Sequence, residues 1–201
     1  MAMIYRCSKA ALEAKARQIL MAYNPDLLDA PQPIPIMEIM EDVYGLNFEY
    51  QYIRNDGRVL GLTVFNSALV PIYDEEYKQY ELIEVKGNTV ILDAHLFDKK
   101  MDGRSRYTCA HELGHYVRHR EFYLAEDLEA AKSGDVELTS EEDSSAEWQA
   151  DYFGCCLLMP KGVVKKAYYR AMGDKVAALA NLFRVSQQSM RIRLQELGLT
   201  S

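Results

Sequence analysis

His111, Glu112 and His115 have the residue types and the spacing of a hydrolytic metal site, within the pentapeptide His-Glu-Leu-Gly-His. On an α-helix, residues four apart differ by about 40° in rotation and about 6 Å in rise, so both imidazoles can bind one ion. Glu112 projects beside them, where its carboxylate can reach a water held by the metal without binding the ion itself. The pattern therefore predicts a zinc site with a general base for peptide hydrolysis.

The residues around the motif predict the helix that this geometry needs. We expect it to begin near Asp102 or Ser105. Because the chain has only four histidines in 201 residues, chance would produce the motif in roughly one such chain in a couple of hundred. A metal site is therefore the preferred interpretation. The apolar face of the expected helix consists of Tyr107, Ala110, Leu113, Gly114 and Val117.

A catalytic zinc ion usually has three protein ligands and one open position, so a third ligand must follow the two histidines. Glu147 is the main candidate, because it begins an apolar helical segment in which Asp151 lies one turn later on the same face. Asp151 could accept the free N–H of a ligand histidine. Alternatively, Ser144 and Glu147 form a capping box, in which Glu147 only bonds the backbone at the helix start. Spacing alone leaves both interpretations open. His119 lies near the expected end of the first helix, so a later carboxylate is the better candidate. Besides Glu147, the candidates are Glu141, Glu142 and Asp143.

Composition predicts a soluble globular protein with one substantial core, since 49% of the residues are hydrophobic and 26% are charged. No apolar stretch is long enough to span a membrane. Residues 1–20 fit an amphipathic helix and lack the features of a signal peptide, so we expect a cytoplasmic protein. The cysteines show no paired metal spacing and are expected to be reduced thiols; Cys109 points away from the face that His111 and His115 share.

Helical and alternating patterns together predict an α+β fold. We expect helices over residues 8–23 and 36–44, and a strand, turn and strand over residues 46–65 with Asn55-Asp56-Gly57 as the turn. A second pair of strands is expected over residues 80–85 and 89–92. The resulting small, antiparallel-rich sheet should pack against the metal-binding helix. We expect a peptidase domain over residues 1–160 and a C-terminal helical segment over residues 161–201.

Charge is distributed unevenly along the second half of the chain. Residues 124–147 contain nine acidic side chains and one lysine, whereas residues 161–201 contain eight basic side chains and two acidic ones. We expect residues 124–145 to form a solvated loop, although such a stretch could also attract a basic substrate toward the catalytic helix.

Residues 176–194 have the pattern of a helix, a tight turn and a second helix, as in DNA-binding proteins. In that interpretation the major groove is read by Gln187, Gln188, Ser189, Arg191 and Arg193, while Lys165, Lys166 and Arg170 contact phosphates. In the other, preferred interpretation, the two helices pack on the core through Leu179, Phe183, Met190, Ile192 and Leu194. A single unit with few basic residues on a chain of net charge −7 would bind DNA weakly.

Two blocks of sequence resemble the ImmA/IrrE family of metallopeptidases. They are residues 106–115, which contain the pentapeptide, and the run from Glu147 through Ala150-Asp151 and Phe153 to Leu157-Leu158-Met159-Pro160. The resemblance extends over roughly residues 34–199. It implies a zincin-like fold in which His111, His115 and Glu147 bind Zn²⁺ and Glu112 is the catalytic base. Where family members commonly have Asn after the helix alanine, this chain has Asp151, and Gly154, Cys155 and Cys156 occupy positions of small residues.

The resemblance also implies a substrate class, because the known substrates of that family are helix-turn-helix repressors. We therefore expect a zinc endopeptidase whose partner is a protein substrate of this kind, without direct DNA binding or membrane association. The alternative function is a DNA-binding or protein-binding regulator that uses the C-terminal helices and has a structural metal or none. The sequence leaves the oligomeric state, the scissile bond and the oxyanion-stabilising residue open.

Overall fold

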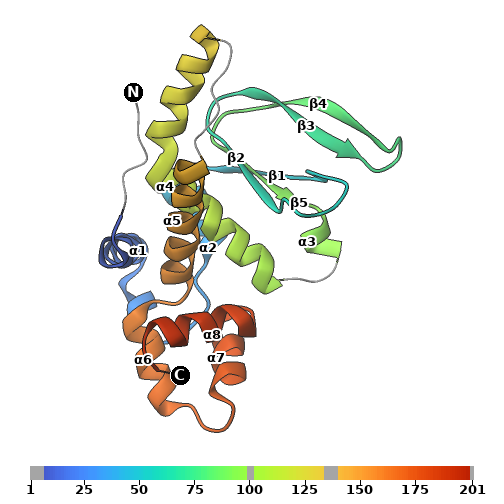
Figure 1. Ribbon diagram of the computed structural model, residues 1–201. Helices are drawn as coiled ribbons and strands as arrows, with labels where there is room; N and C mark the ends of the chain where they lie inside the picture. Colours follow the sequence, from blue (N-terminus) through green and yellow to red (C-terminus); the bar gives the residue numbers. More distant parts are fainter. Residues whose placement is uncertain (1–6, 99–101, 134–139, 200–201) are drawn as a thin grey trace.

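The computed structural model describes residues 7–98, 102–133 and 140–199, with side chains placed outside residues 98 and 125–144. In Figure 1 the two sheets lie on one side of the long helix α4, and α1 and α5 lie on the other. The C-terminal helices gather beneath them. The helices are α1 (Lys9–Tyr23), the 3-10 helix η1 (Pro25–Leu28), α2 (Ile36–Tyr44), α3 (His95–Asp98), α4 (Asp102–Ser133), α5 (Ser140–Leu158), α6 (Lys161–Arg170), α7 (Lys175–Phe183) and α8 (Gln187–Glu196).

Local capping explains where the N-terminal helices begin and end. Ser8 caps α1, because its Oγ accepts a hydrogen bond from the backbone N–H of Ala11 at 3.2 Å. Helix α2 ends at Gly45, whose φ of 61° lies in the left-handed region that glycine adopts without strain. The two predicted helices over residues 8–23 and 36–44 are thus confirmed.

The strands pair differently from the sequence-based prediction. Strand β5 (Thr89–Asp93) lies between β1 (Asn47–Gln51), which is parallel to it, and β2 (Gly61–Val64), which is antiparallel. Neither expected hairpin forms, so both predicted pairings were wrong. Every residue of β5 is buried, which is typical of a central strand covered on both faces. Its backbone pairs with a strand on each edge, and β1 and β2 are the two edge strands of this sheet.

A second sheet contains a strand that the sequence analysis did not predict. Strand β3 (Ala68–Asp74) pairs antiparallel with β4 (Gln79–Val85). Pro71 lies within β3, although proline cannot donate a hydrogen bond to a ladder. It is tolerated here since the sheet has only two strands, and each has an edge without a strand partner within the described residues. Two of the three strand pairs are antiparallel, and the α+β fold class is confirmed.

Helices α4 and α5 are both longer than predicted. Helix α4 continues to Ser133 and α5 already begins at Ser140, so most of the loop expected over residues 124–145 is helical. The capping-box interpretation of Glu147 was wrong for the same reason, because this residue lies two turns inside α5 rather than at its start. His119 likewise lies well inside α4. The side chains of Glu141, Glu142 and Asp143 are outside the described residues.

Small residues bring α4 and α5 into close contact. A Cβ atom added to Gly114 would lie 2.9 Å from Cα of Ala150, and one added to Gly154 would lie 3.2 Å from the backbone of Ala110. Both distances are shorter than ordinary carbon–carbon contacts, which begin near 3.5 Å. The two helix backbones therefore approach as closely as they do only because these positions lack side chains.

The C-terminal helices share the main core. Leu179, Phe183, Met190 and Leu194 are buried in one cluster with residues of α1, α2, α4 and α5, as the preferred interpretation predicted. Ile192 is an exception, since 49% of its surface is exposed. The predicted division into a peptidase domain that ends at residue 160 and a C-terminal segment remains a prediction.

Arg193 lies on the buried side of α8, not on a surface that could face DNA. Its side chain has no exposed surface and forms an ion pair of 2.7 Å with Glu13 of α1. Its Nε also donates to the backbone oxygen of Met159 at 3.0 Å. The groove-reading role considered for Arg193 was therefore wrong.

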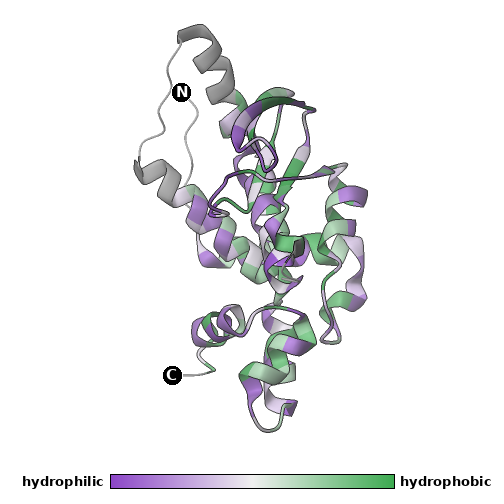
Figure 2. Ribbon diagram, turned by 90° about the vertical axis from the view of Figure 1, so that its right-hand side faces the viewer, coloured by the Kyte–Doolittle hydropathy of each residue, from purple (hydrophilic) through white to green (hydrophobic). Residues whose placement is uncertain are grey.

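The helices combine polar and apolar residues along their length, as the alternation of green and purple in Figure 2 shows. Among the described residues, no helix has both the length and the apolar character that a membrane span requires. The four cysteines are free thiols, and Cys109, Cys155 and Cys156 are buried.

Candidate metal centre

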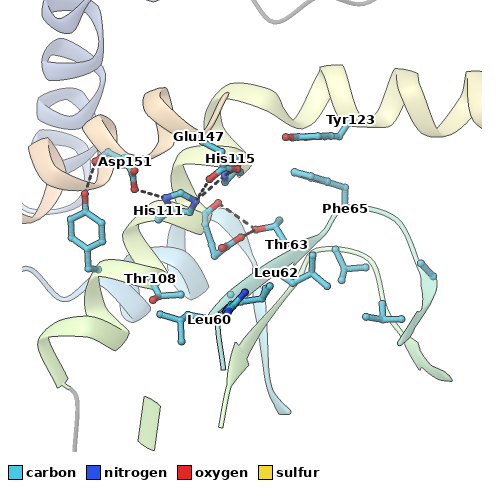
Figure 3. Close-up of a pocket in the computed structure, with 18 of the residues that line it drawn as sticks. Leu60, Leu62, Thr63, Phe65, Thr108, His111, His115, Tyr123, Glu147 and Asp151 are labelled. Carbon is cyan, nitrogen blue, oxygen red and sulfur yellow. Dashed lines mark hydrogen bonds and ion pairs between the residues drawn. The ribbon is translucent and has the colours of Figure 1, made fainter. Parts of the chain in front are cut away.

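Three potential metal ligands meet where α4 crosses α5. His111 and His115 project from one face of α4, and Glu147 projects toward them from α5 (Figure 3). The two Nε2 atoms are 3.0 Å apart. Glu147 Oε2 lies 3.2 Å from Nε2 of His111, and Oε1 lies 3.1 Å from Nε2 of His115. Among the described residues, these three form a group whose ligand atoms all lie within 4.8 Å of one another.

The separations of these atoms fit a zinc-sized ion. Ligand atoms about 2.05 Å from zinc at the corners of a tetrahedron are roughly 3.3 Å apart, close to the separations of 3.0, 3.1 and 3.2 Å found here. Two imidazole nitrogens and one carboxylate oxygen also suit zinc and its transition-metal neighbours better than Ca²⁺ or Mg²⁺, which prefer oxygen ligands. The residues present therefore fit a bound zinc ion.

The second ring nitrogen of each histidine has its own partner. Nδ1 of His111 lies 2.9 Å from Oδ1 of Asp151, one turn after Glu147 on α5. Nδ1 of His115 lies 3.3 Å from Nδ1 of the buried His119. Partners of this kind fix the tautomer and the orientation of a ligand histidine, so that Nε2 faces the metal.

The charges around the two histidines are strongly coupled. Burial alone would lower the pKa of His111, but its hydrogen bonds to Asp151 and Glu147 outweigh burial and raise this pKa to about 10. Hydrogen bonds from His111 and from His115 hold the pKa of Glu147 far below its usual value. Burial lowers the pKa of His119 to about 4, helped by the charges of His115 and Arg118. His119 is thus neutral near pH 7 and can accept a hydrogen bond from His115.

Glu112 lines the same cavity as the three potential ligands and is bonded to strand β2. Its side chain is only 6% exposed, and its Oε2 accepts a hydrogen bond of 2.6 Å from the hydroxyl of Thr63. The carboxylate therefore borders the cluster on the side of the sheet, the position expected for a base that acts beside a metal.

Comparison with known proteins agrees with this geometry. Residues 74–195 match the family model described as the IrrE N-terminal-like domain of peptidases. This match covers more than half of the chain, including α4 and α5. The chain belongs to this family. No curated protein matches the sequence of this IrrE-like chain.

One similar solved structure is a Mycobacterium tuberculosis transcriptional regulator, with a TM-score of 0.53 and 16% sequence identity. The alignment covers 92% of the IrrE-like chain and 55% of the regulator, so the chain spans about half of that protein. At this identity the likeness concerns the fold alone. Membership of a peptidase family supports a metallopeptidase, and the group of His111, His115 and Glu147 could hold its metal ion.

A cavity of about 840 Å³ lies between α4 and strand β2 of this IrrE-like domain. The three potential ligands, Glu112 and Asp151 line it. Phe65 and Tyr123 line it as well, and their rings are stacked with centroids 5.4 Å apart (Figure 3). A cavity of this volume beside an edge strand is large enough for several residues of an extended peptide.

The structure thus brings together all five residues that the sequence analysis singled out: His111, Glu112, His115, Glu147 and Asp151. It also reveals two neighbours that the sequence analysis did not assign to the site. Thr63 had no recognisable signal, because only the packing of β2 on α4 brings it to Glu112. His119 had one, since it follows His115 by one helical turn and its ring therefore reaches the same face.

Proposed function

We propose that this chain is a zinc-dependent endopeptidase that cleaves a helix-turn-helix transcriptional repressor in the cytoplasm. The observation that carries the proposal is the convergence of His111, His115 and Glu147 at zinc-like separations, with Glu112 beside them. Membership of a peptidase family supports it. The substrate class rests on the ImmA/IrrE resemblance, and the location follows from a transcriptional repressor as the substrate.

Residues of this chain would act in sequence on a bound peptide. Zinc, when held by the three ligands, polarises the scissile carbonyl and acidifies a water molecule. Glu112 accepts a proton from that water and returns it to the leaving amine. Asp151 and His119 keep the histidine rings in place. Strand β2 pairs with β5 on one side and has no strand partner on its other side within the described residues, so an extended substrate could add to it as a further strand.

Two tyrosines line the cavity among the described residues, Tyr107 and Tyr123. The hydroxyl of Tyr107 donates to the backbone oxygen of Asp151 at 3.0 Å and is therefore engaged away from the reacting bond. Tyr123 projects from α4 with its hydroxyl on the side of the cavity where His115 and Glu147 lie (Figure 3). We therefore assign Tyr123 as the donor that stabilises the oxyanion.

The experiment is incubation of the zinc-loaded protein with the helix-turn-helix repressor encoded beside its gene, followed by mass spectrometry. We expect a single cut, and we expect Glu112→Gln to slow cleavage by a factor of about 100 to 10,000 because the general base is lost. Glu121→Gln, an exposed residue of the same helix, is the matched control and should cleave at the wild-type rate. Equal rates for Glu112→Gln and the wild type would rule out this mechanism.

A regulator is the second candidate function, because α7 and α8 form a helix-turn-helix pair. The burial of Arg193 removes one of its expected DNA contacts, so we consider it the weaker candidate. Sequence-specific DNA binding at physiological salt, without cleavage of the repressor, would favour this function over the peptidase.

A further inference from the structure

We propose that strand β2 positions the general base, through the hydroxyl of Thr63 and the open space at Gly61. The inference rests on the proposed function, in which Glu112 takes a proton from water. Gly61 and Thr63 are two residues apart in a strand, so they face the same side of the sheet. That side is directed at Glu112, the residue between the two histidines of the motif.

The contact of Thr63 with Glu112 is specific and short. The hydroxyl Oγ1 lies 2.6 Å from Oε2 of Glu112 and 3.4 Å from the backbone oxygen of the same residue. A hydroxyl that donates to an ionised carboxylate forms one of the stronger hydrogen bonds in proteins. It holds one carboxylate oxygen, whereas the other oxygen is left to accept a proton.

Gly61 leaves the space that the other carboxylate oxygen occupies. A Cβ atom at this position would lie 2.6 Å from Oε1 and 2.9 Å from Cγ of Glu112, and 2.7 Å from Cγ2 of Thr108. Any side chain here would therefore displace the glutamate. Strand β2 therefore limits the position of Oε1 at Gly61 and forms a hydrogen bond to Oε2 through Thr63.

Positioning of this kind is needed because a glutamate has several rotatable bonds and its carboxylate can take many orientations. Ordering such a side chain costs up to about 2 kcal/mol of conformational entropy, which the strand offsets before substrate binds. A purely structural contact between sheet and helix would affect stability alone. A positioning contact also affects the protonation and reactivity of the site.

The test compares the cleavage kinetics of the zinc-loaded wild-type protein with those of Thr63→Val and Thr63→Ser, together with the melting temperature of each protein. Co²⁺ is also bound in place of zinc, because its absorption bands report changes around the metal without any substrate. A purely structural contact changes stability and leaves kcat alone, whereas loss of a bond that orients the base lowers kcat and leaves KM near the wild-type value. A net hydrogen bond of ordinary strength corresponds to a loss of about threefold to tenfold.

We expect kcat of Thr63→Val to fall by that amount with KM near the wild-type value, while its Co²⁺ bands, Co²⁺ affinity and melting temperature stay near those of the wild type. Thr63→Ser, which keeps the hydroxyl, should restore most of kcat. Glu112→Gln marks the effect of losing the base altogether. Gly61→Ala should also lower kcat, because it displaces the carboxylate.

An unchanged kcat in Thr63→Val, beside a wild-type protein that binds Co²⁺ and cleaves its repressor, would overturn the positioning role and leave the peptidase intact. A loss of kcat that Thr63→Ser does not reverse would also overturn it. A wild-type protein that fails to bind Co²⁺ would overturn both proposals. If Gly61→Ala does not fold, Thr63→Val and Thr63→Ser still decide the question.

Discussion

The metal centre and the contact between Arg193 and Glu13 both hold ionisable side chains at a helix interface, but they arrange the charges differently. Arg193 has no exposed surface and is bound by a carboxylate and a backbone oxygen of the same chain. At the metal centre, two imidazoles and a carboxylate turn their ligand atoms toward one another. The first arrangement satisfies a charge within the protein, whereas the second suits a cation shared by three ligands. Buried charge alone is therefore weak evidence for a functional site, and convergence of ligand atoms is stronger evidence.

The largest effect on stability is expected at the ion pair between Arg193 and Glu13. Arg193→Met leaves Glu13 without its partner and should lower the free energy of unfolding by about 3–5 kcal/mol. Urea denaturation measures this loss. Arg191→Met, an exposed neighbour on the same helix, should change stability by less than about 0.5 kcal/mol. If the metal affinity of Arg193→Met fell as strongly as its stability, the two regions would not be independent.

The second prediction concerns the third ligand. Glu147→Ala should lower zinc affinity at least tenfold, with little change in melting temperature, because the residue lies inside α5 and does not cap it. Competition with a chelator measures the affinity. Glu121→Ala, an exposed glutamate of α4, is the control and should bind zinc as the wild type does. Wild-type affinity in Glu147→Ala would remove this residue from the metal site.

The third prediction tests the partner of His115. His119→Ala removes the acceptor next to Nδ1 of His115 and should lower zinc affinity by about tenfold. His119→Gln retains an acceptor and should recover part of that loss. The same chelator competition compares the two variants. Equal zinc affinities for His119→Ala and His119→Gln would show that the rings of His115 and His119 are in packing contact only.

The smallest effect is expected from a buried thiol of α5. Burial raises the pKa of Cys155 from 9.0 to about 12. This thiol stays protonated in the folded protein while it ionises near pH 9 in the unfolded chain, so its contribution to stability is lost as pH rises from about 9 to 12. Melting temperatures measured between pH 8 and 11 should fall, and Cys155→Ala should weaken the dependence. A fall of the same size in Cys155→Ala would assign the effect to other groups.

The sequence predicted what depends on local periodicity. The spacing of His111 and His115 determines that both rings lie on one helix face, whatever the rest of the fold. The strand pairings could not be predicted in the same way, because the turn signals at residues 55–57 and 86–88 suggested neighbours in sequence. Strand β5 instead pairs with β1 and β2, because its uniformly buried residues belong at the centre of a sheet, where the backbone pairs on both edges.

The remaining parts of the site depend on contacts between distant segments. The sequence alone allowed Glu147 to be either a helix cap or a metal ligand. The length of α5 excludes the cap, and the packing of α5 on α4 brings Glu147 to His111. Thr63 is an ordinary strand residue in the sequence, and only the tertiary structure places its hydroxyl 2.6 Å from Glu112. Such assignments require the three-dimensional arrangement, because no sequence period connects residues 49 or 36 positions apart.

The contact of Gly114 with Ala150 has a consequence for how the centre responds to losing its ion. The gap between α4 and α5 is set by backbone against backbone, and both helices are anchored in the apolar core on their other faces. The ligand residues are therefore held by the fold and not by the ion that they would bind. Unlike a zinc finger, which unfolds without its metal, this domain would keep its shape when zinc is withdrawn. Under the proposed function, the supply of zinc would then switch cleavage on and off reversibly, without refolding or replacement of the protein.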